Sequence, residues 1–98
     1  MKILAIESQA AEVQSNAYEP YLKEEALKVW ELYKKGIIRE IYFREEWKGA
    51  VIILECENYG KASEWLNLLP LVKNNLIKFE IIPLIPYPGF ERLFDKPD

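Results

Sequence analysis

The order of strand-like and helix-like segments constrains the fold of this chain most. Four β-rich segments cover about 2–8, 37–44, 50–57 and 76–84, and two segments with helical apolar spacing cover about 20–35 and 59–69. Strand–helix–strand–strand–helix–strand is the order of a ferredoxin-like β-α-β-β-α-β sandwich. The sequence therefore predicts an α+β fold, in which a four-stranded antiparallel sheet carries both helices on one face.

The ends of the two helices carry specific signals. Pro20 suits the first turn of the first helix, and Gly36 supplies its stop. Asn58 is the predicted N-cap of the second helix, and Pro70 is predicted to end it. The apolar stripe of the first helix consists of Leu22, Ala26, Val29, Trp30 and Tyr33. Its aromatic members are expected in the core or at the rim of the core.

Length and composition exclude several classes of protein. Residues 1–98 make one domain, with a C-terminal arm at about 85–98. No apolar run approaches the roughly 20 residues of a membrane span, and no signal peptide is recognisable, so a cytoplasmic location is expected. A net charge of −3 without a basic cluster argues against nucleic acid. Enrichment in Lys and Glu suggests a heat-loving source.

The chain contains no histidine and a single cysteine, Cys56. This composition removes the usual general base, the commonest zinc ligand and every Ser-His or Cys-His nucleophile pair. We therefore predict no metal site and no cofactor. Cys56 alternates onto the helix side with Leu54 and is expected to be a buried, inert thiol, with a reactive thiol as the alternative.

The faces of the sheet follow from the pairing of the central hairpin. If Arg44 pairs with Gly49, the helix side carries Ile41, Phe43, Ala50, Ile52 and Leu54. The opposite, open face then carries Ile38, Glu40, Tyr42, Val51, Ile53 and Glu55, together with Ile3, Ala5 and Glu7 of the first strand. A monomer would expose Ile3, Ile38, Val51 and Ile53 together, so we predict a homodimer or a multiple of dimers. The alternative is an ordinary solvated face.

Three segments of the chain stand out as landmarks: Glu31–Gly36 followed by Ile37-Ile38-Arg39, Trp65–Leu71 and Ile81–Leu84. In these segments, over about residues 25–88, the chain resembles the muconolactone isomerase family of small dimeric α/β-barrel proteins. The first twenty residues do not share this resemblance. The resemblance implies a dimeric α/β barrel and isomerisation of a small unsaturated organic acid or lactone by carboxylate proton transfer.

Candidate site residues follow from that chemistry. Glu7, Glu40 and Glu55 are the candidate catalytic carboxylates, because burial and like charge can raise a carboxyl pKa far enough for acid–base work. The candidate contacts of a small organic ligand are Tyr42, Ile38, Ile53 and Tyr18. The alternative is that these glutamates are solvated or form interface salt bridges. Two other functions stay open, a non-catalytic binding or assembly module and a cofactor-independent oxygenase.

The C-terminal arm combines apolar side chains with prolines. Pro86 and Pro88 alternate with residues such as Tyr87, Phe90 and Phe94. Prolines exclude the arm from a central strand, whereas its apolar side chains are unfavourable in a free end. We therefore expect the arm to lie against its own subunit or to cross to a neighbouring one.

Overall fold

The computed structural model describes residues 1–9, 15–46 and 49–94 and confirms the α+β class. Its strands are β1 (Lys2–Gln9), β2 (Ile38–Phe43), β3 (Ala50–Glu55) and β4 (Ile77–Pro83), and its helices are α1 (Leu22–Lys34), α2 (Tyr59–Leu66) and α3 (Pro70–Lys73). Short 3₁₀ helices are η1 (Ser15–Ala17), η2 (Glu19–Tyr21) and η3 (Gly89–Leu93).

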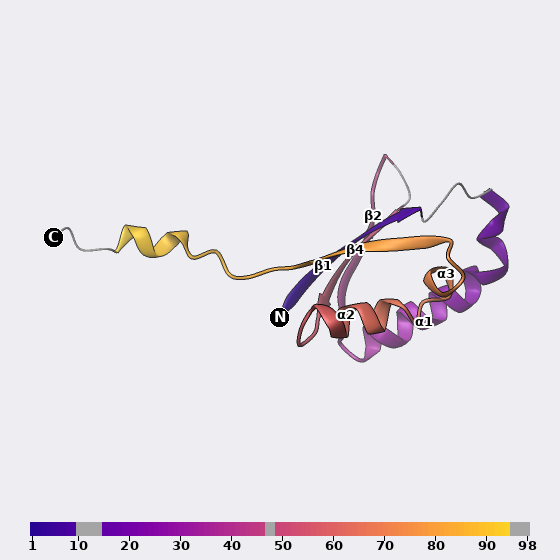
Figure 1. The fold of residues 1–98 in the computed structure, drawn as a ribbon, viewed down its shortest axis with the longest axis horizontal. Helices are drawn as coiled ribbons and strands as arrows, with labels where there is room; N and C mark the ends of the chain where they lie inside the picture. Colours follow the sequence, from indigo (N-terminus) through magenta and orange to yellow (C-terminus); the bar gives the residue numbers. More distant parts are fainter. Residues whose placement is uncertain (10–14, 47–48, 95–98) are drawn as a thin grey trace.

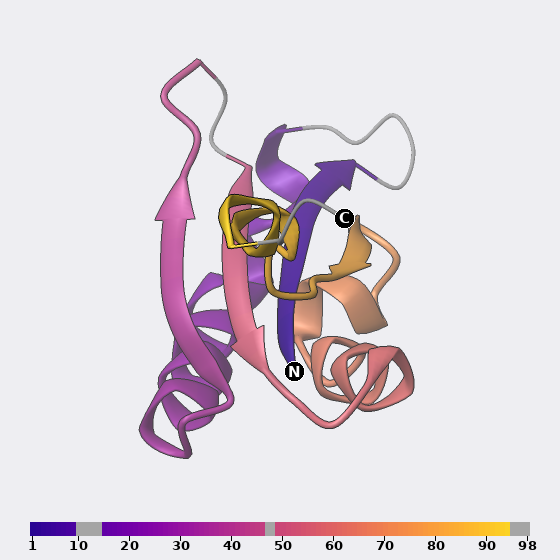
Figure 2. The same cartoon turned by 90° about the vertical axis from the view of Figure 1, so that its left-hand side faces the viewer.

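The four strands form one antiparallel sheet in the order β2-β3-β1-β4, so β2 and β4 are the edge strands (Figure 2). The helices α1, α2 and α3 lie on one side of this sheet (Figure 1). The arrangement is compatible with a ferredoxin-like sandwich. In the described ranges, no helix is long and apolar enough to cross a membrane.

The helix termini confirm two of the predicted signals and correct a third. Gly36 has φ +78°, and the N–H of Ile37 donates to the carbonyl of Leu32 at 3.0 Å, which closes α1. The Asn58 side chain accepts from the N–H of Lys61 at 2.9 Å and caps α2. Pro70 does not end α2, which stops at Leu66. It is the first residue of α3, where a missing N–H costs nothing.

The core lies between the sheet and the helices, and it corrects the predicted faces of β1. Ile3 pairs with Leu54 and Ala5 with Ile52, so both β1 residues face the helices and are fully buried. The prediction that they lie on the open face was wrong. The core cluster is Ile3, Ala5, Leu32, Ile38, Ala50, Ile52, Leu54, Ala62, Leu66 and Leu69.

The β2–β3 hairpin has the predicted pairing but an unforeseen irregularity. The N–H of Arg44 donates to the carbonyl of Gly49 at 3.0 Å, and Ile41 pairs with Ile52 as expected. The register shifts between Ile38 and Glu40, where β2 contains an extra residue. Ile38 therefore pairs with Leu54 and is buried in the core. Its predicted place on the open face was wrong.

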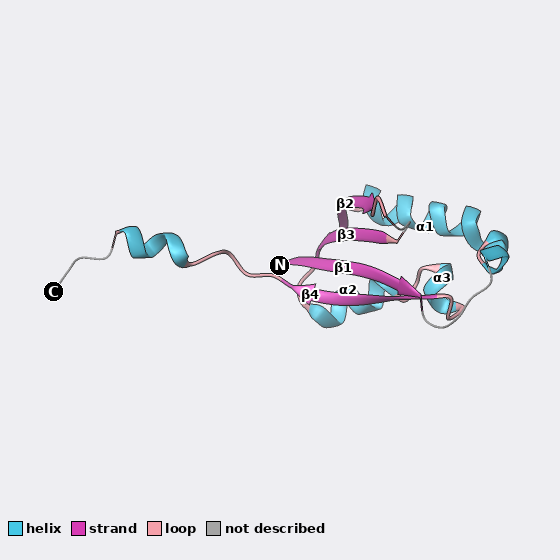
Figure 3. Ribbon diagram, turned by 90° about the horizontal axis from the view of Figure 1, so that it is seen from above, coloured by secondary structure: helices cyan, strands magenta, loops and turns pink. Residues whose placement is uncertain are grey.

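The open face of the sheet is apolar, and it carries Val51 and Ile53 as predicted, with Leu4, Ile6 and Ile82 in place of Ile3 and Ile38. Cross-strand pairs join Leu4 to Ile53 and to Ile82, and Ile6 to Val51. All five of these side chains are half-buried. The described helices lie on the other side of the sheet, so they do not cover this aliphatic strip (Figure 3). We call these five residues the open-face strip.

The described part of the C-terminal arm, residues 85–94, runs away from the sandwich (Figure 1). The molecule measures 64 × 29 × 21 Å, and its radius of gyration is 16.8 Å, against about 13 Å for a compact chain of this length. Docking of the arm on its own subunit is therefore not observed. Leu84 donates its N–H to the carbonyl of Lys2, so by alternation the nitrogen of Pro83 faces the outer edge of β4, where the ladder needs no donor.

Candidate functional site

The three predicted carboxylates do not meet. Glu7 lies on the helix side of β1, as Ile3 and Ala5 do. Glu40 and Glu55 are exposed and share the opposite face of the sheet with Ile53, because Glu40 pairs with Ile53 and Glu55 is two residues further along β3. Glu55 forms an ion pair with the amino group of Met1 at 3.5 Å. The predicted chamber containing all three was wrong, because its geometry depended on the inverted faces of β1.

Glu7 instead interacts electrostatically with Glu25, a residue that was not among the candidates predicted from the sequence. We call them the carboxylate pair. Glu7 Oε1 accepts from the N–H of Ala50 at 3.2 Å, and Glu25 Oε1 accepts from the N–H of Leu71 at 3.0 Å. Both side chains are half-buried. Burial raises the pKa of both carboxyls, the backbone hydrogen bonds partly oppose the rise, and the negative charge of Glu7 raises the pKa of Glu25 further.

Local backbone geometry explains where the carboxylate pair lies. Regular pairing of β1 with β3 ends at Ile6–Val51, and the Glu7 carboxylate then accepts the next N–H of β3. The first turn of α3 receives no side-chain cap from Leu69, and Glu25 of α1 supplies an acceptor there. Glu25 lies in the first turn of its helix beside Glu24, so its partial burial could be inferred only from the position of α3.

Such a pair can exchange protons. A carboxyl that burial holds above its ordinary pKa is a stronger base once ionised, and it can return the proton as an acid. The residues of the pair and their backbone partners come from the end of β1 and from the starts of β3, α1 and α3. The structure therefore provides acid–base groups on the helix side of the sheet, and within residues 1–9, 15–46 and 49–94 the three predicted carboxylates form no cluster.

The candidate ligand contacts are also divided among different places. Tyr42 and Ile53 lie on the open face, where the Tyr42 hydroxyl donates to Glu40 Oε1 at 2.7 Å. That hydrogen bond and the charge of Glu40 raise the pKa of Tyr42. Ile38 is in the core and cannot line a chamber on that face. Tyr18 precedes η2 at the start of α1, outside the sheet.

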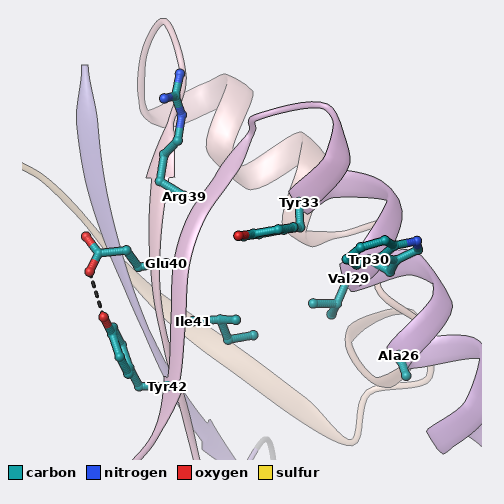
Figure 4. Close-up of a pocket in the computed structure, with 8 residues that line it drawn as sticks. All are labelled: Ala26, Val29, Trp30, Tyr33, Arg39, Glu40, Ile41 and Tyr42. Carbon is teal, nitrogen blue, oxygen red and sulfur yellow. Dashed lines mark hydrogen bonds between the residues drawn. The ribbon is translucent and has the colours of Figure 1, made fainter.

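A groove runs between α1 and the edge strand β2 (Figure 4). It has a volume of about 580 Å³, and its lining residues are Ala26, Val29, Trp30, Tyr33, Arg39, Glu40, Ile41 and Tyr42. The rings of Trp30 and Tyr33 stack with centroids 5.9 Å apart, and Lys34 Nζ lies 5.8 Å from the Trp30 centroid. We call this the α1–β2 groove.

The groove exists because α1 turns its apolar stripe only partly toward the sheet. Leu32, which lies outside the predicted stripe, is the buried residue of α1. Of the stripe, Val29 packs against the core, whereas Leu22, Trp30 and Tyr33 are about half exposed. Trp30 and Tyr33 were expected in the core or at its rim, and their exposure excludes a position in the core. The spacing of the sequence identified the apolar residues of α1, but it did not identify Leu32 as the residue of the helix that faces the core.

Cys56 is the single cysteine of the chain. Its thiol is half-buried, and burial raises its pKa, which disfavours the nucleophilic thiolate. Among the described side chains, no group of three His, Cys, Asp or Glu could hold a metal ion. Comparison with models of known protein families and with curated proteins finds no match to this chain.

Replacing Glu25 with Gln should raise the melting temperature at pH 7 but not in acid. Burial raises the folded pKa above the ordinary 4.5, so the folded chain holds this proton more tightly than the unfolded chain does. The resulting stability is present below the unfolded pKa and is lost as pH rises through the folded pKa. Gln carries no charge, and its oxygen can still accept from Leu71.

Melting curves between pH 3 and pH 8 measure this difference, with Glu64→Gln as the control. Glu64 is an exposed residue of α2, paired with Lys61 at 3.3 Å. We expect the gain of Glu25→Gln to shrink toward zero as pH falls below the ordinary glutamate range, and the control to change little at any pH. A gain of constant size at every pH would contradict a buried charge as its cause.

Proposed function

We propose that this chain is a homodimeric α/β-barrel protein of the muconolactone isomerase type, which binds a small unsaturated organic acid or lactone and shifts a proton within it. The carboxylate pair of Glu7 and Glu25 is the observation that carries the chemical part of this proposal. Glu7 is the acid–base residue, and its negative charge raises the pKa of Glu25.

The open-face strip supports the assembly part. Five aliphatic side chains form adjacent cross-strand pairs on a sheet face that the described helices leave uncovered. Packing two such faces together removes this apolar surface from water, and each Å² of apolar surface buried stabilises the dimer by roughly 25 cal/mol. A two-fold axis that lies between the two sheets places each strip against the same strip of the partner. The Tyr42–Glu40 hydrogen bond lies on this face, toward the edge strand.

The proposed reaction needs only a positioned carboxylate. The Glu7 carboxylate takes a proton from a carbon next to the carbonyl, and the C–H electron pair enters the conjugated π-system as an enolate. The carboxylic acid then returns the proton at the far carbon of that system, which restores the carboxylate. No oxidant, reductant or metal enters the balance. A raised pKa makes the ionised carboxylate a stronger base, so it makes the first step, proton transfer from carbon, less unfavourable.

A non-catalytic binding or assembly module of the same fold is the second candidate. The observation that favours it is the structural role of both carboxylates, which satisfy the backbone N–H groups of Ala50 and Leu71. Buried donors without acceptors are costly, so these hydrogen bonds would justify both glutamates without any catalysis. The two candidates differ in what replacement of a carboxylate by its amide does.

Deuterium exchange at carbon, followed by NMR over a panel of unsaturated lactones, tests the proposal. We expect Glu7→Gln to slow exchange by about 10²-fold or more, because the amide keeps the shape but cannot act as a base. Glu64→Gln is the control and should exchange at the wild-type rate. Wild-type exchange in Glu7→Gln, or no exchange with any lactone, would leave the binding module as the better function.

A further inference from the structure

The C-terminal arm presents a large apolar surface that its own sandwich does not cover. Ile85, Tyr87, Phe90, Leu93 and Phe94 are all at least 65% exposed, and Phe94 reaches 81%. Exposed apolar surface of this extent marks an interaction site. The described arm runs away from its own sheet and helices, so the partner surface must be sought on another molecule (Figure 1).

The arm is partly ordered in advance. Pro86 and Pro88 restrict its backbone, and η3 follows them. Tyr87 folds back over Gly89, where a Cβ atom would collide with its ring, and its ring meets Phe90 edge-on at 5.0 Å. Gly89 is therefore required to admit the Tyr87 ring. A segment that already holds its aromatic side chains in place loses less entropy when it binds.

The α1–β2 groove is the complementary surface. Trp30 and Tyr33 of α1 are about half exposed there, and the partly exposed Ile41 of β2 lines the groove with them. Lys34 and Arg39 give this region positive charge and Glu40 gives it negative charge, while the arm carries Glu91 and Arg92. The two surfaces therefore match in apolar character, and each offers both signs of charge.

Topology separates the two surfaces within one chain. The groove borders β2, the arm continues β4, and these strands are the opposite edges of the sheet (Figure 2). The arm also leaves along the strand direction instead of turning back across the sheet. The groove of the same chain is thus on the far side of the molecule from the arm. The groove of a second copy of the chain is not subject to this separation.

We infer that the C-terminal arm of each protomer binds in the α1–β2 groove of a second copy of this chain. This inference rests on the proposed homodimer and names which surfaces join its subunits beyond the open-face strip. Two-fold symmetry then makes the exchange reciprocal, so that each groove is filled by an arm. The groove is consequently a protein-binding surface, distinct from the carboxylate pair.

A double-mutant cycle on the full chain tests the contact. The variants are Phe90→Ala in the arm, Trp30→Ala in the groove and the two combined, with self-association measured by sedimentation equilibrium. We expect each single change to weaken the dimer at least tenfold, as loss of an aromatic anchor does. The double variant should weaken it by clearly less than the product of the two effects, because both remove the same contact. Tyr59→Ala is the control, since Tyr59 on α2 is 54% exposed, against 53% for Trp30.

Intermolecular paramagnetic broadening locates the arm directly. A nitroxide is attached at Leu93→Cys in a Cys56→Ser background, and this chain is mixed with an isotope-labelled wild-type chain. Broadening of the Trp30 indole and the Ile41 amide in the labelled copy would support the inference. Broadening confined to Leu4 and Ile82 would overturn it in favour of the open face.

Two further outcomes separate this inference from the proposed function. A dimer whose cycle shows no coupling and whose spectra show no intermolecular broadening would overturn arm exchange alone. A wild-type chain that stays monomeric at millimolar concentration would overturn both arm exchange and the homodimer. Circular dichroism of every variant establishes that the sandwich is folded before association is compared.

Discussion

Leu54→Ala is expected to lower the free energy of unfolding by about 2–5 kcal/mol. Leu54 is 0% exposed and pairs with Ile3 on one side and with Ile38 on the other, so its side chain lies at the centre of the helix-facing core. The truncation removes apolar contacts and leaves a cavity that three strands together cannot close. Urea denaturation followed by circular dichroism measures the loss.

Leu68→Ala provides the matched control. The chemical change is the same, but Leu68 is 42% exposed in the turn between α2 and α3. We expect its free energy of unfolding to stay within about 0.5 kcal/mol of the wild type. Equal losses in the two variants would contradict the placement of the core between β3 and the helices.

Local signals in the sequence predicted the elements well, because each depends on a few neighbouring residues. Gly36 ends α1 through its positive φ, and Asn58 caps α2 through one side-chain oxygen. The hairpin pairing of Arg44 with Gly49 likewise fixed the faces of β3, where Ile52 and Leu54 are buried as expected. These features need no knowledge of distant segments.

The faces of β1 and of the start of β2 are set by pairing with a distant segment, the strand β3. Ile3 and Ala5 alternate with Leu4 and Ile6, so both faces of β1 are apolar, and the pattern alone does not identify the core side. The cross-strand partner Leu54 decides it. Next to Ile38, one extra residue in β2 reverses the alternation of its side chains between the two faces of the sheet. The sequence of β2 contains no glycine that would indicate such a bulge.

The candidate site was only partly predictable for the same reason. Glu7 was identified as a candidate from its strand position, but its neighbours were assigned from the wrong face. Glu25 becomes notable only because α3 brings the N–H of Leu71 to it, across 46 residues of sequence. The α1–β2 groove likewise depends on the rotation of α1 over the sheet, which places Leu32 inward and Trp30 outward.

Ile53→Glu is expected to dissociate the proposed dimer without unfolding the chain. Ile53 lies at the middle of the open-face strip, opposite Leu4 and away from the core. In the dimer, each new carboxylate would be buried in an apolar interface without a partner, and such a charge costs about 3–5 kcal/mol. Two copies meet across a two-fold axis, so the dissociation constant should rise roughly a thousandfold or more.

Sedimentation equilibrium and circular dichroism measure the two halves of this prediction separately. Leu68→Glu places the same charge on an exposed aliphatic position of the helix side, outside the strip, and should leave the dimer intact. Retained secondary structure in a monomeric Ile53→Glu chain would show that the strip serves association and not folding. A dimer that tolerates Ile53→Glu would mean that the subunits join elsewhere, and the open-face strip would then have to be an ordinary solvated surface.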